Sequence, residues 1–302
     1  MSDSLPMELI LAILTDAAEL FVVSDRASVC SLALTASFVR DIIRPILFRR
    51  MVVTDKNARA VGTALEIGTA GSLVLDLCLS YGSWEPQDQI VAGFTQIRCL
   101  RGYPDVMERI LPRLPASAQK SLFKLQLWDD ELVRNIPPSV THVCLFFDRP
   151  RPPMLGPVES WLSALPSITH IGCELVTRRT EQARWDAPAT ANELAQDLQD
   201  LISAAKSRPV EFHFRLCGNI SDALWAGYIG RICANSEQAG KVLQLDQRIS
   251  LWRDTRIIDT LSDDLEACYI DAHAGVDVWS EARPVGELLA DLNPKASETI
   301  ND

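Results

Sequence analysis

The chain has 302 residues, of which 47% are hydrophobic and 23% are charged, the balance of a globular protein. Its formal net charge of −11 argues against general nucleic-acid binding, which requires a basic face. No apolar run reaches the length of a membrane span, and Asp3 and Glu8 stand where a secretion signal would carry positive charge. We therefore expect a cytoplasmic or nuclear protein that binds neither nucleic acid nor membrane.

Residues 1–50 are predicted to form a small unit of three helices. Ser24 and Asp25 are candidate N-caps of the second helix, and Pro45 should break the third because proline has no backbone N–H. The first helix has apolar side chains at helical spacing, namely Leu9, Ile10, Ile13, Leu14 and Ala17. A unit of this size is marginal alone. Its apolar face is therefore expected either to bind a partner or to cap the domain that follows.

This segment also resembles an F-box, the module that joins a substrate receptor to a Skp–cullin ubiquitin ligase. The Leu-Pro-x-Glu-aliphatic start of F-boxes is matched by residues 5–9, and their Ile-Leu pair by residues 13–14. Their small or aliphatic run ending in an aromatic residue is matched by residues 30–38, with Phe38 in place of the commoner Trp. The Pro-x-Leu-Phe-Arg phrase of fungal examples is matched by residues 45–49.

The resemblance implies partners and contact residues for this unit. The partners would be the Skp adaptor and, through it, a cullin, with a protein substrate bound elsewhere on the chain. By matching positions, the adaptor-binding residues would be Leu5, Pro6, Leu9, Ile10, Ile13, Leu14 and Phe38.

Residues 51–292 alternate short strand-like runs with helical candidates. After a β-type run at 51–54, strands are predicted at 72–79, 94–100, 122–127, 140–146, 168–173, 210–216 and 265–270. Helices are predicted at 58–67, 105–114, 158–165, 191–205, 222–235 and 254–261. The phrases at 138–143 and 165–171 are near copies, which indicates a degenerate repeat.

These patterns predict an α/β fold in which an F-box-like unit (1–50) precedes an irregular leucine-rich-repeat-like α/β solenoid (51–292). Residues 293–302 would form a flexible tail. The alternative architecture is an ordinary α/β sheet domain with helices on both faces.

No catalytic residue, cofactor site or metal site is predicted. The eight cysteines are scattered without a Cys-x-x-Cys pair, which favours buried free thiols over a zinc site. His142 and His170 hold the same place in the two similar phrases and should lie side by side on adjacent strands. A metal or acid–base role is conceivable there. A structural role is favoured, because no carboxylate recurs beside them at a fixed offset.

Two tryptophans at strand-end loops, Trp84 and Trp128, are candidate substrate contacts if exposed and core residues if buried. The chain is thus interpreted as a non-enzymatic substrate receptor of a Skp–cullin–F-box ligase. The competing hypothesis is an interaction scaffold whose helical unit only caps the solenoid. In that case the Leu9–Ile13 face would be buried against residues 51–100.

Overall fold

The protein is an open, mixed α/β structure in which three N-terminal helices precede a nine-stranded sheet. This computed structural model describes residues 6–54, 56–67, 69–79, 88–128, 131–147, 155–176, 204–205, 208–217, 222, 225–227, 229–230, 248–255, 271, 276 and 278–292. Within these residues, none of the helices is both long enough and apolar enough to cross a bilayer.

The N-terminal helices are α1 (Met7–Ser24), α2 (Arg26–Ala33) and α3 (Ser37–Arg49), and they share a small core of their own. The predicted cap at Asp25 is confirmed, because its Oδ1 accepts a hydrogen bond from the Ser28 N–H at 3.1 Å. The predicted break at Pro45 is wrong, since α3 continues through it. Ile46 and Leu47, just beyond the proline, are buried, and their packing offsets the hydrogen bond that the proline removes.

The sheet is built from strands that follow one another in space in the order of the chain, β1 to β9. The first eight pair in parallel and β9 pairs antiparallel to β8. The strands are β1 (Arg50–Val53), β2 (Asp76–Leu79), β3 (Cys99–Gly102), β4 (Lys124–Leu127), β5 (His142–Phe147), β6 (His170–Val176), β7 (Glu211–Cys217), β8 (Ile249–Asp254) and β9 (Arg283–Pro284).

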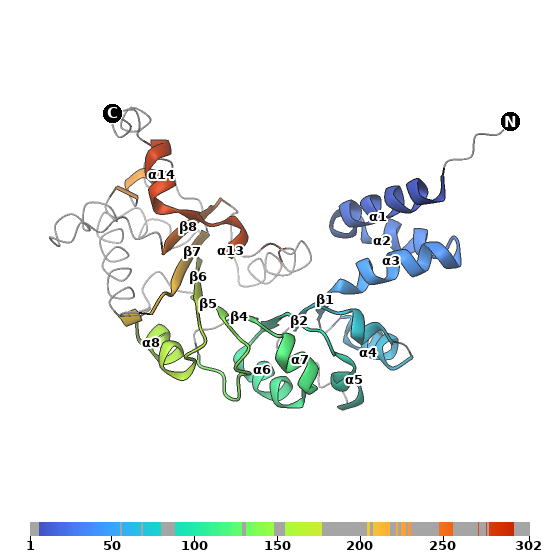
Figure 1. The fold of residues 1–302 in the computed structure, drawn as a ribbon, viewed down its shortest axis with the longest axis horizontal. Helices are drawn as coiled ribbons and strands as arrows, with labels where there is room; N and C mark the ends of the chain where they lie inside the picture. Colours follow the sequence, from blue (N-terminus) through green and yellow to red (C-terminus); the bar gives the residue numbers. More distant parts are fainter. Residues whose placement is uncertain are drawn as a thin grey trace.

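The helices between the strands lie on the outer face of an arch (Figure 1). They are α4 (Ala58–Ile67), α5 (Asp88–Gly93), α6 (Pro104–Ile110), α7 (Ala116–Ser121) and α8 (Leu155–Ala164), with the 3₁₀ turns η1 (Thr69–Leu73) and η2 (Leu111–Arg113). Parallel crossovers are right-handed, so repeating them in one direction places every connecting helix on the same side. The short α13 (Val278–Glu281) contacts β6 and β7, and α14 (Val285–Leu292) follows β9.

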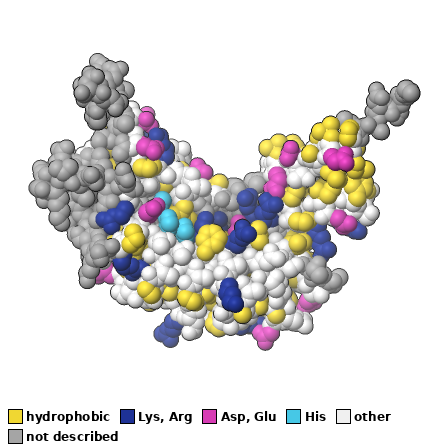
Figure 2. Space-filling model, in the orientation of Figure 1, with side chains coloured by type: hydrophobic (Ala, Val, Ile, Leu, Met, Phe, Trp, Pro, Cys, Tyr) yellow, Lys and Arg dark blue, Asp and Glu magenta, His cyan; other side chains and the backbone are white. Residues whose placement is uncertain are grey.

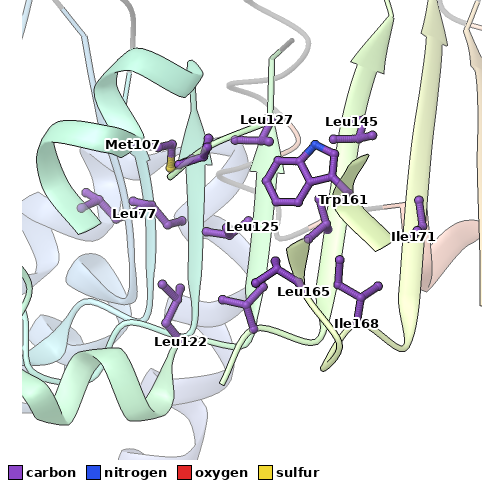
Figure 3. Close-up of a cluster of buried hydrophobic side chains, with 14 of the residues drawn as sticks. Leu77, Met107, Leu122, Leu125, Leu127, Leu145, Trp161, Leu165, Ile168 and Ile171 are labelled. Carbon is purple, nitrogen blue, oxygen red and sulfur yellow. The ribbon is translucent and has the colours of Figure 1, made fainter. Parts of the chain in front are cut away.

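The outward-pointing residues of the strands form the main hydrophobic core. This face of the sheet includes Leu77, Leu125, Leu145 and Ile171, from β2, β4, β5 and β6, which belong to one core with Met107 and Trp161 of the covering helices (Figure 3). Because side chains alternate along a strand, the residues between them point to the inner face. There the buried residues include Arg101, Gln126, Glu174 and Arg215, so the inner face carries buried polar and charged groups that the outer face lacks.

Most predicted elements are present, some with shifted ends. Helix 58–67 matches α4, and the strands expected at 122–127, 140–146, 168–173 and 210–216 overlap β4 to β7. The strand expected at 72–79 is shorter, since residues 69–73 form η1, and α5, α7 and β8 were not expected. The strand expected at 265–270 and the tail 293–302 lie outside the described residues, as do most of the helices expected at 191–205, 222–235 and 254–261.

Candidate functional site

The N-terminal helices expose an unusual amount of apolar surface. Of the nine large hydrophobic side chains that are exposed in the described part of the chain, seven lie between residues 7 and 38. They are Met7, Leu9, Ile13, Leu20, Phe21, Leu34 and Phe38. Figure 2 shows hydrophobic side chains gathered on this arm of the molecule. Contiguous apolar surface of this kind marks an interaction site in soluble proteins.

Helix α1 is apolar on two sides. Leu14, Ala18 and Val22, spaced by four residues, pack into the core shared with α2 and α3. Leu9, Ile13 and Leu20 are spaced by four and seven residues, so they share a different side of the helix. This second side is turned to solvent, because Leu9 is 45% exposed and Ile13 is 51% exposed.

The residues predicted to bind an adaptor therefore fall into three groups. Pro6, Leu9, Ile13 and Phe38 are exposed. Ile10 and Leu14 are half-buried, and Leu14 packs against the core of the helical unit. Leu5 lies outside the described residues. The capping hypothesis requires the Leu9–Ile13 face to be buried against residues 51–100, but this face is exposed.

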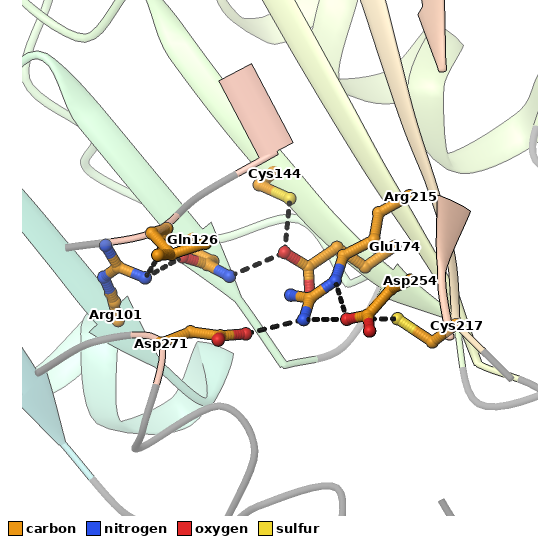
Figure 4. Close-up of polar contacts among 9 residues, drawn as sticks. Arg101, Gln126, Cys144, Glu174, Arg215, Cys217, Asp254 and Asp271 are labelled. Atoms are coloured by element: carbon orange, nitrogen blue, oxygen red, sulfur yellow. Dashed lines mark hydrogen bonds and ion pairs between the residues drawn. The ribbon is translucent and has the colours of Figure 1, made fainter. Parts of the chain in front are cut away.

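On the inner face of the sheet, the charged centre is Arg215 of β7 (Figure 4). Its Nη2 lies 2.6 Å from Asp254 Oδ2 of β8 and 2.6 Å from Asp271 Oδ2, and its Nη1 lies 3.4 Å from Glu174 Oε2 of β6. The network continues across the sheet to Gln126, whose Nε2 donates to Glu174 Oε1 at 2.9 Å. Arg101 Nη1 then donates to Gln126 Oε1 at 2.7 Å.

Burial and ion pairing together set the proton affinities in this network. Burial raises the pKa of Glu174, Asp254 and Asp271 above the ordinary carboxyl value, although the positive charge of Arg215 opposes the rise. Burial works against the charge of Arg215 as well, but Glu174 and the other carboxylates raise its pKa above the ordinary value. Arg215 therefore stays charged, and it holds three acidic groups and three segments of chain together.

A C-terminal segment crosses this inner face. We call it the strap and define it by Asp271, Val276 and α13 (Val278–Glu281). Besides the Asp271–Arg215 pair, Arg101 Nη1 donates to the Val276 carbonyl at 3.3 Å. The Trp279 ring lies 5.4 Å from the His142 ring, with Lys124 Nζ 4.8 Å from its centroid. The strap thus touches β3, β4, β5 and β7.

The strap approaches the sheet so closely at Gly172 of β6 that only glycine fits. A Cβ atom built at this position would lie 2.6 Å from Val278 Cγ1 and 2.9 Å from Cys144 Sγ. Both distances are shorter than atoms in contact allow, so the side chains of Val278 in the strap and Cys144 in β5 would have to move.

Of the two alternatives for Trp128, the structure shows the buried one, so Trp128 is a core residue and not an exposed substrate contact. It is only 6% exposed and packs with Val52 and Cys78, with its ring edge-on to Tyr103 at 5.3 Å. Trp128 follows directly after β4, and at this position neighbouring strands and Tyr103 cover its ring. Trp84 lies outside the described residues.

A row of histidines also lines the inner face. His142 and His170 are register partners on β5 and β6, and their rings stack 4.0 Å apart, which confirms the predicted neighbourhood. The His213 ring of β7 follows at 5.8 Å from His170. Glu211 pairs with His170 in the sheet, and its Oε2 lies 3.4 Å from His170 Nε2 and 3.6 Å from His213 Nε2.

Glu211 is the carboxylate that the sequence analysis did not expect beside the histidines. The long connection between β6 and β7 hides the pairing, since no fixed spacing relates residues 170 and 211. Burial lowers the pKa of His170, and Lys124 lowers it further, while Glu211 opposes the shift. His170 is thus held in its neutral form more strongly than a histidine in water.

No family model matches this chain, and no significant match was found among curated proteins or solved structures.

Proposed function

We propose that the chain is the substrate-recognition subunit of a Skp–cullin–F-box ubiquitin ligase. The observation that carries the proposal is the exposed apolar side of α1 and Phe38, described above. Four of the residues at which the chain resembles an F-box, Pro6, Leu9, Ile13 and Phe38, lie on this surface.

The energetics favour a partner for this surface. Complete burial of a leucine or isoleucine side chain contributes about 1.5–3 kcal/mol, and each of these side chains is only half covered in the free chain. A helix bundle with a groove for one apolar side of α1 would cover the remainder. The Skp adaptor is the partner that the resemblance implies, and the adaptor in turn would bring the cullin.

The sheet supports the second half of the proposal, a leucine-rich-repeat-like solenoid that binds a protein substrate. Strands in chain order with connecting helices on the outer side make each unit contact mainly its neighbours. Figure 2 shows the molecule hollowed between the N-terminal helices and the C-terminal part, with lysine and arginine side chains along the hollow. We place substrate binding in this hollow and assign the ubiquitin-transfer chemistry to other subunits.

The competing scaffold hypothesis makes a requirement that helix α1 does not meet. It requires the Leu9–Ile13 face to pack against residues 51–100, and both side chains are exposed instead.

The test is co-purification of the full chain with the Skp adaptor, beside a chain that lacks residues 1–50. A second pair of variants isolates the surface: Leu9→Asp with Ile13→Asp places charge on the exposed apolar side of α1. Ala12→Asp places the same charge on another exposed position of the same helix. We expect the first variant to lose the adaptor and the second to retain it. Retention by the Leu9→Asp/Ile13→Asp variant, with its helix content intact, would contradict the proposal.

A further inference from the structure

Three side chains with metal-binding atoms converge on the inner face where β6 pairs with β7. They are His170, Glu211 and His213, and one ligand atom from each lies within 4.8 Å of the other two. Glu211 Oε2 stands between the rings, 3.4 Å from one Nε2 and 3.6 Å from the other. No motif places them together, because only the parallel register of β6 and β7 brings His170 beside Glu211.

The spacing of these atoms suits a metal ion. Zinc binds histidine nitrogen and carboxylate oxygen at about 2.0–2.1 Å, so two ligands of a tetrahedral ion lie about 3.3 Å apart. Both distances from Glu211 Oε2 are within a few tenths of an ångström of that separation. All three ligand atoms lie within 4.8 Å of one another, so side-chain movements can bring them around one ion.

The hydrogen bonds of His170 orient it as a ligand. Its Nδ1 lies 2.8 Å from the Thr169 hydroxyl, and that hydroxyl donates to the Thr141 carbonyl at 3.4 Å. In the tautomer in which this hydroxyl donates to the carbonyl and accepts from the ring, the imidazole proton is on Nδ1. The lone pair of Nε2 then faces a carboxylate oxygen. In this tautomer two acceptors face each other, and either a proton or a metal cation between them removes the repulsion.

We propose that His170, Glu211 and His213 bind one divalent transition-metal ion, with Zn²⁺ as the best-suited ion. Two imidazoles and one carboxylate without a thiolate favour zinc over the softer Cu(I), and the histidines disfavour Mg²⁺ and Ca²⁺, which take oxygen ligands. The Glu211 and His170 side chains are 50% and 27% exposed, so solvent reaches the site and a water molecule can take a fourth position.

The surroundings fit this role. Thr169 supports the ring of His170 from behind, as outer hydrogen-bond partners of metal-binding histidines do. The stacked His142 ring fixes its plane. The ion would join β6 to β7 beside the strap. The site shares no residue with the N-terminal surface, so it stands independently of the proposed adaptor binding.

The experiment is a titration of the chelator-treated full chain with Zn²⁺, followed by calorimetry and by the thermal midpoint of unfolding. Cys30 is an exposed thiol, so all variants carry Cys30→Ser to remove a competing ligand. We expect one ion per chain and a higher thermal midpoint. Glu211→Gln and His213→Asn should each abolish stoichiometric binding, whereas His142→Phe, which keeps the stacked ring, should bind as the parent does. Absence of stoichiometric binding, or equal binding by Glu211→Gln, would overturn the proposal.

A matched pair of threonines gives a second readout. Thr169→Val removes the support of a ligand and should weaken Zn²⁺ binding about 10–100-fold. Thr141 makes the equivalent 2.8 Å contact with Nδ1 of His142, which is not a ligand, so Thr141→Val should leave the affinity within about threefold of the parent. Equal affinities for the two variants would contradict the assigned ligand set, even if metal binds elsewhere on the chain.

Discussion

The N-terminal helices and the inner face of the sheet place their side chains in opposite ways. The helices turn leucine, isoleucine and phenylalanine toward solvent, whereas the sheet buries arginine, glutamate and aspartate. The first arrangement leaves free energy to be gained when a partner covers the surface. The second is costly to assemble and costly to break, because buried charges depend on one another. Partner binding is therefore expected of the helices, and a fixed arrangement of strands is expected of the sheet.

Among the variants considered, Arg215→Met should reduce the stability of the protein most. It leaves Glu174, Asp254 and Asp271 buried without their shared guanidinium. Removal of one partner from a buried ion network costs about 3–5 kcal/mol, so we expect a loss of that size in urea unfolding. Arg215→Lys keeps the charge but not the geometry, so its free energy of unfolding should lie between those of the parent and Arg215→Met. A loss below about 1 kcal/mol for Arg215→Met would show that the network contributes little to stability.

Gly172→Ala tests the contact between the strap and the sheet. The added methyl group has no room beside Val278 and Cys144. Overpacking of this kind costs about 1–3 kcal/mol. Val278→Ala in the same chain makes space, and we expect the double variant to be more stable than the sum of the two single changes predicts. Strict additivity would mean that the strap is not seated on Gly172 in solution.

The pH dependence of unfolding tests the buried acids. The folded state raises the pKa of Glu174, so between the ordinary carboxyl value and the raised value it holds more protons than the unfolded state. The free energy of unfolding must then fall as pH rises through this window, by up to about 1.4 kcal/mol per pH unit for each such group. Glu174→Gln should flatten that slope, and an unchanged slope would exclude Glu174 as its source.

The smallest expected effect on stability lies on the N-terminal helices. Leu9→Ala and Ile13→Ala remove exposed side chains, so the free energy of unfolding should change by less than about 0.5 kcal/mol. Ile43→Ala, in the core of the same unit, should cost about 2–5 kcal/mol. The exposed pair should nevertheless weaken adaptor binding, together with Pro6→Ala, in a pull-down with the Skp adaptor. A large stability loss for Leu9→Ala would place that side chain in a core.

Sequence patterns recovered those parts of the fold in which local chemistry decides the structure. Helix α4 and strands β4 to β7 have clear periodicity, and Asp25 caps α2 through a contact three residues away. Pro45 was misjudged because tertiary packing of Ile46 and Leu47 outweighs a local rule. Strand β8 was missed because it ends in Arg253 and Asp254, whose charges meet Asp222 and Arg215 only in the folded chain.

The inner face was least accessible to prediction, because its contacts depend on register. Glu211 meets His170 only through the pairing of β6 with β7, across a connection that no repeat length predicts. Arg215 likewise pairs with Asp271, a residue that lies beyond the last parallel strand in the sequence. Charged residues in a strand are ordinarily interpreted as solvent-facing, and nothing local marks these as buried.

The order of the strands has a consequence for how the chain folds as it is synthesised. Each strand pairs with the one made just before it, so the arch can grow from β1 onward without waiting for distant segments. The strap is the exception, since the bond from Arg101 to Val276 spans 175 residues. Until the chain beyond residue 270 has emerged, Arg215 lacks its ion pair with Asp271, and α13 does not yet contact β6 and β7. A segment synthesised after all eight parallel strands is thus the one that locks the sheet.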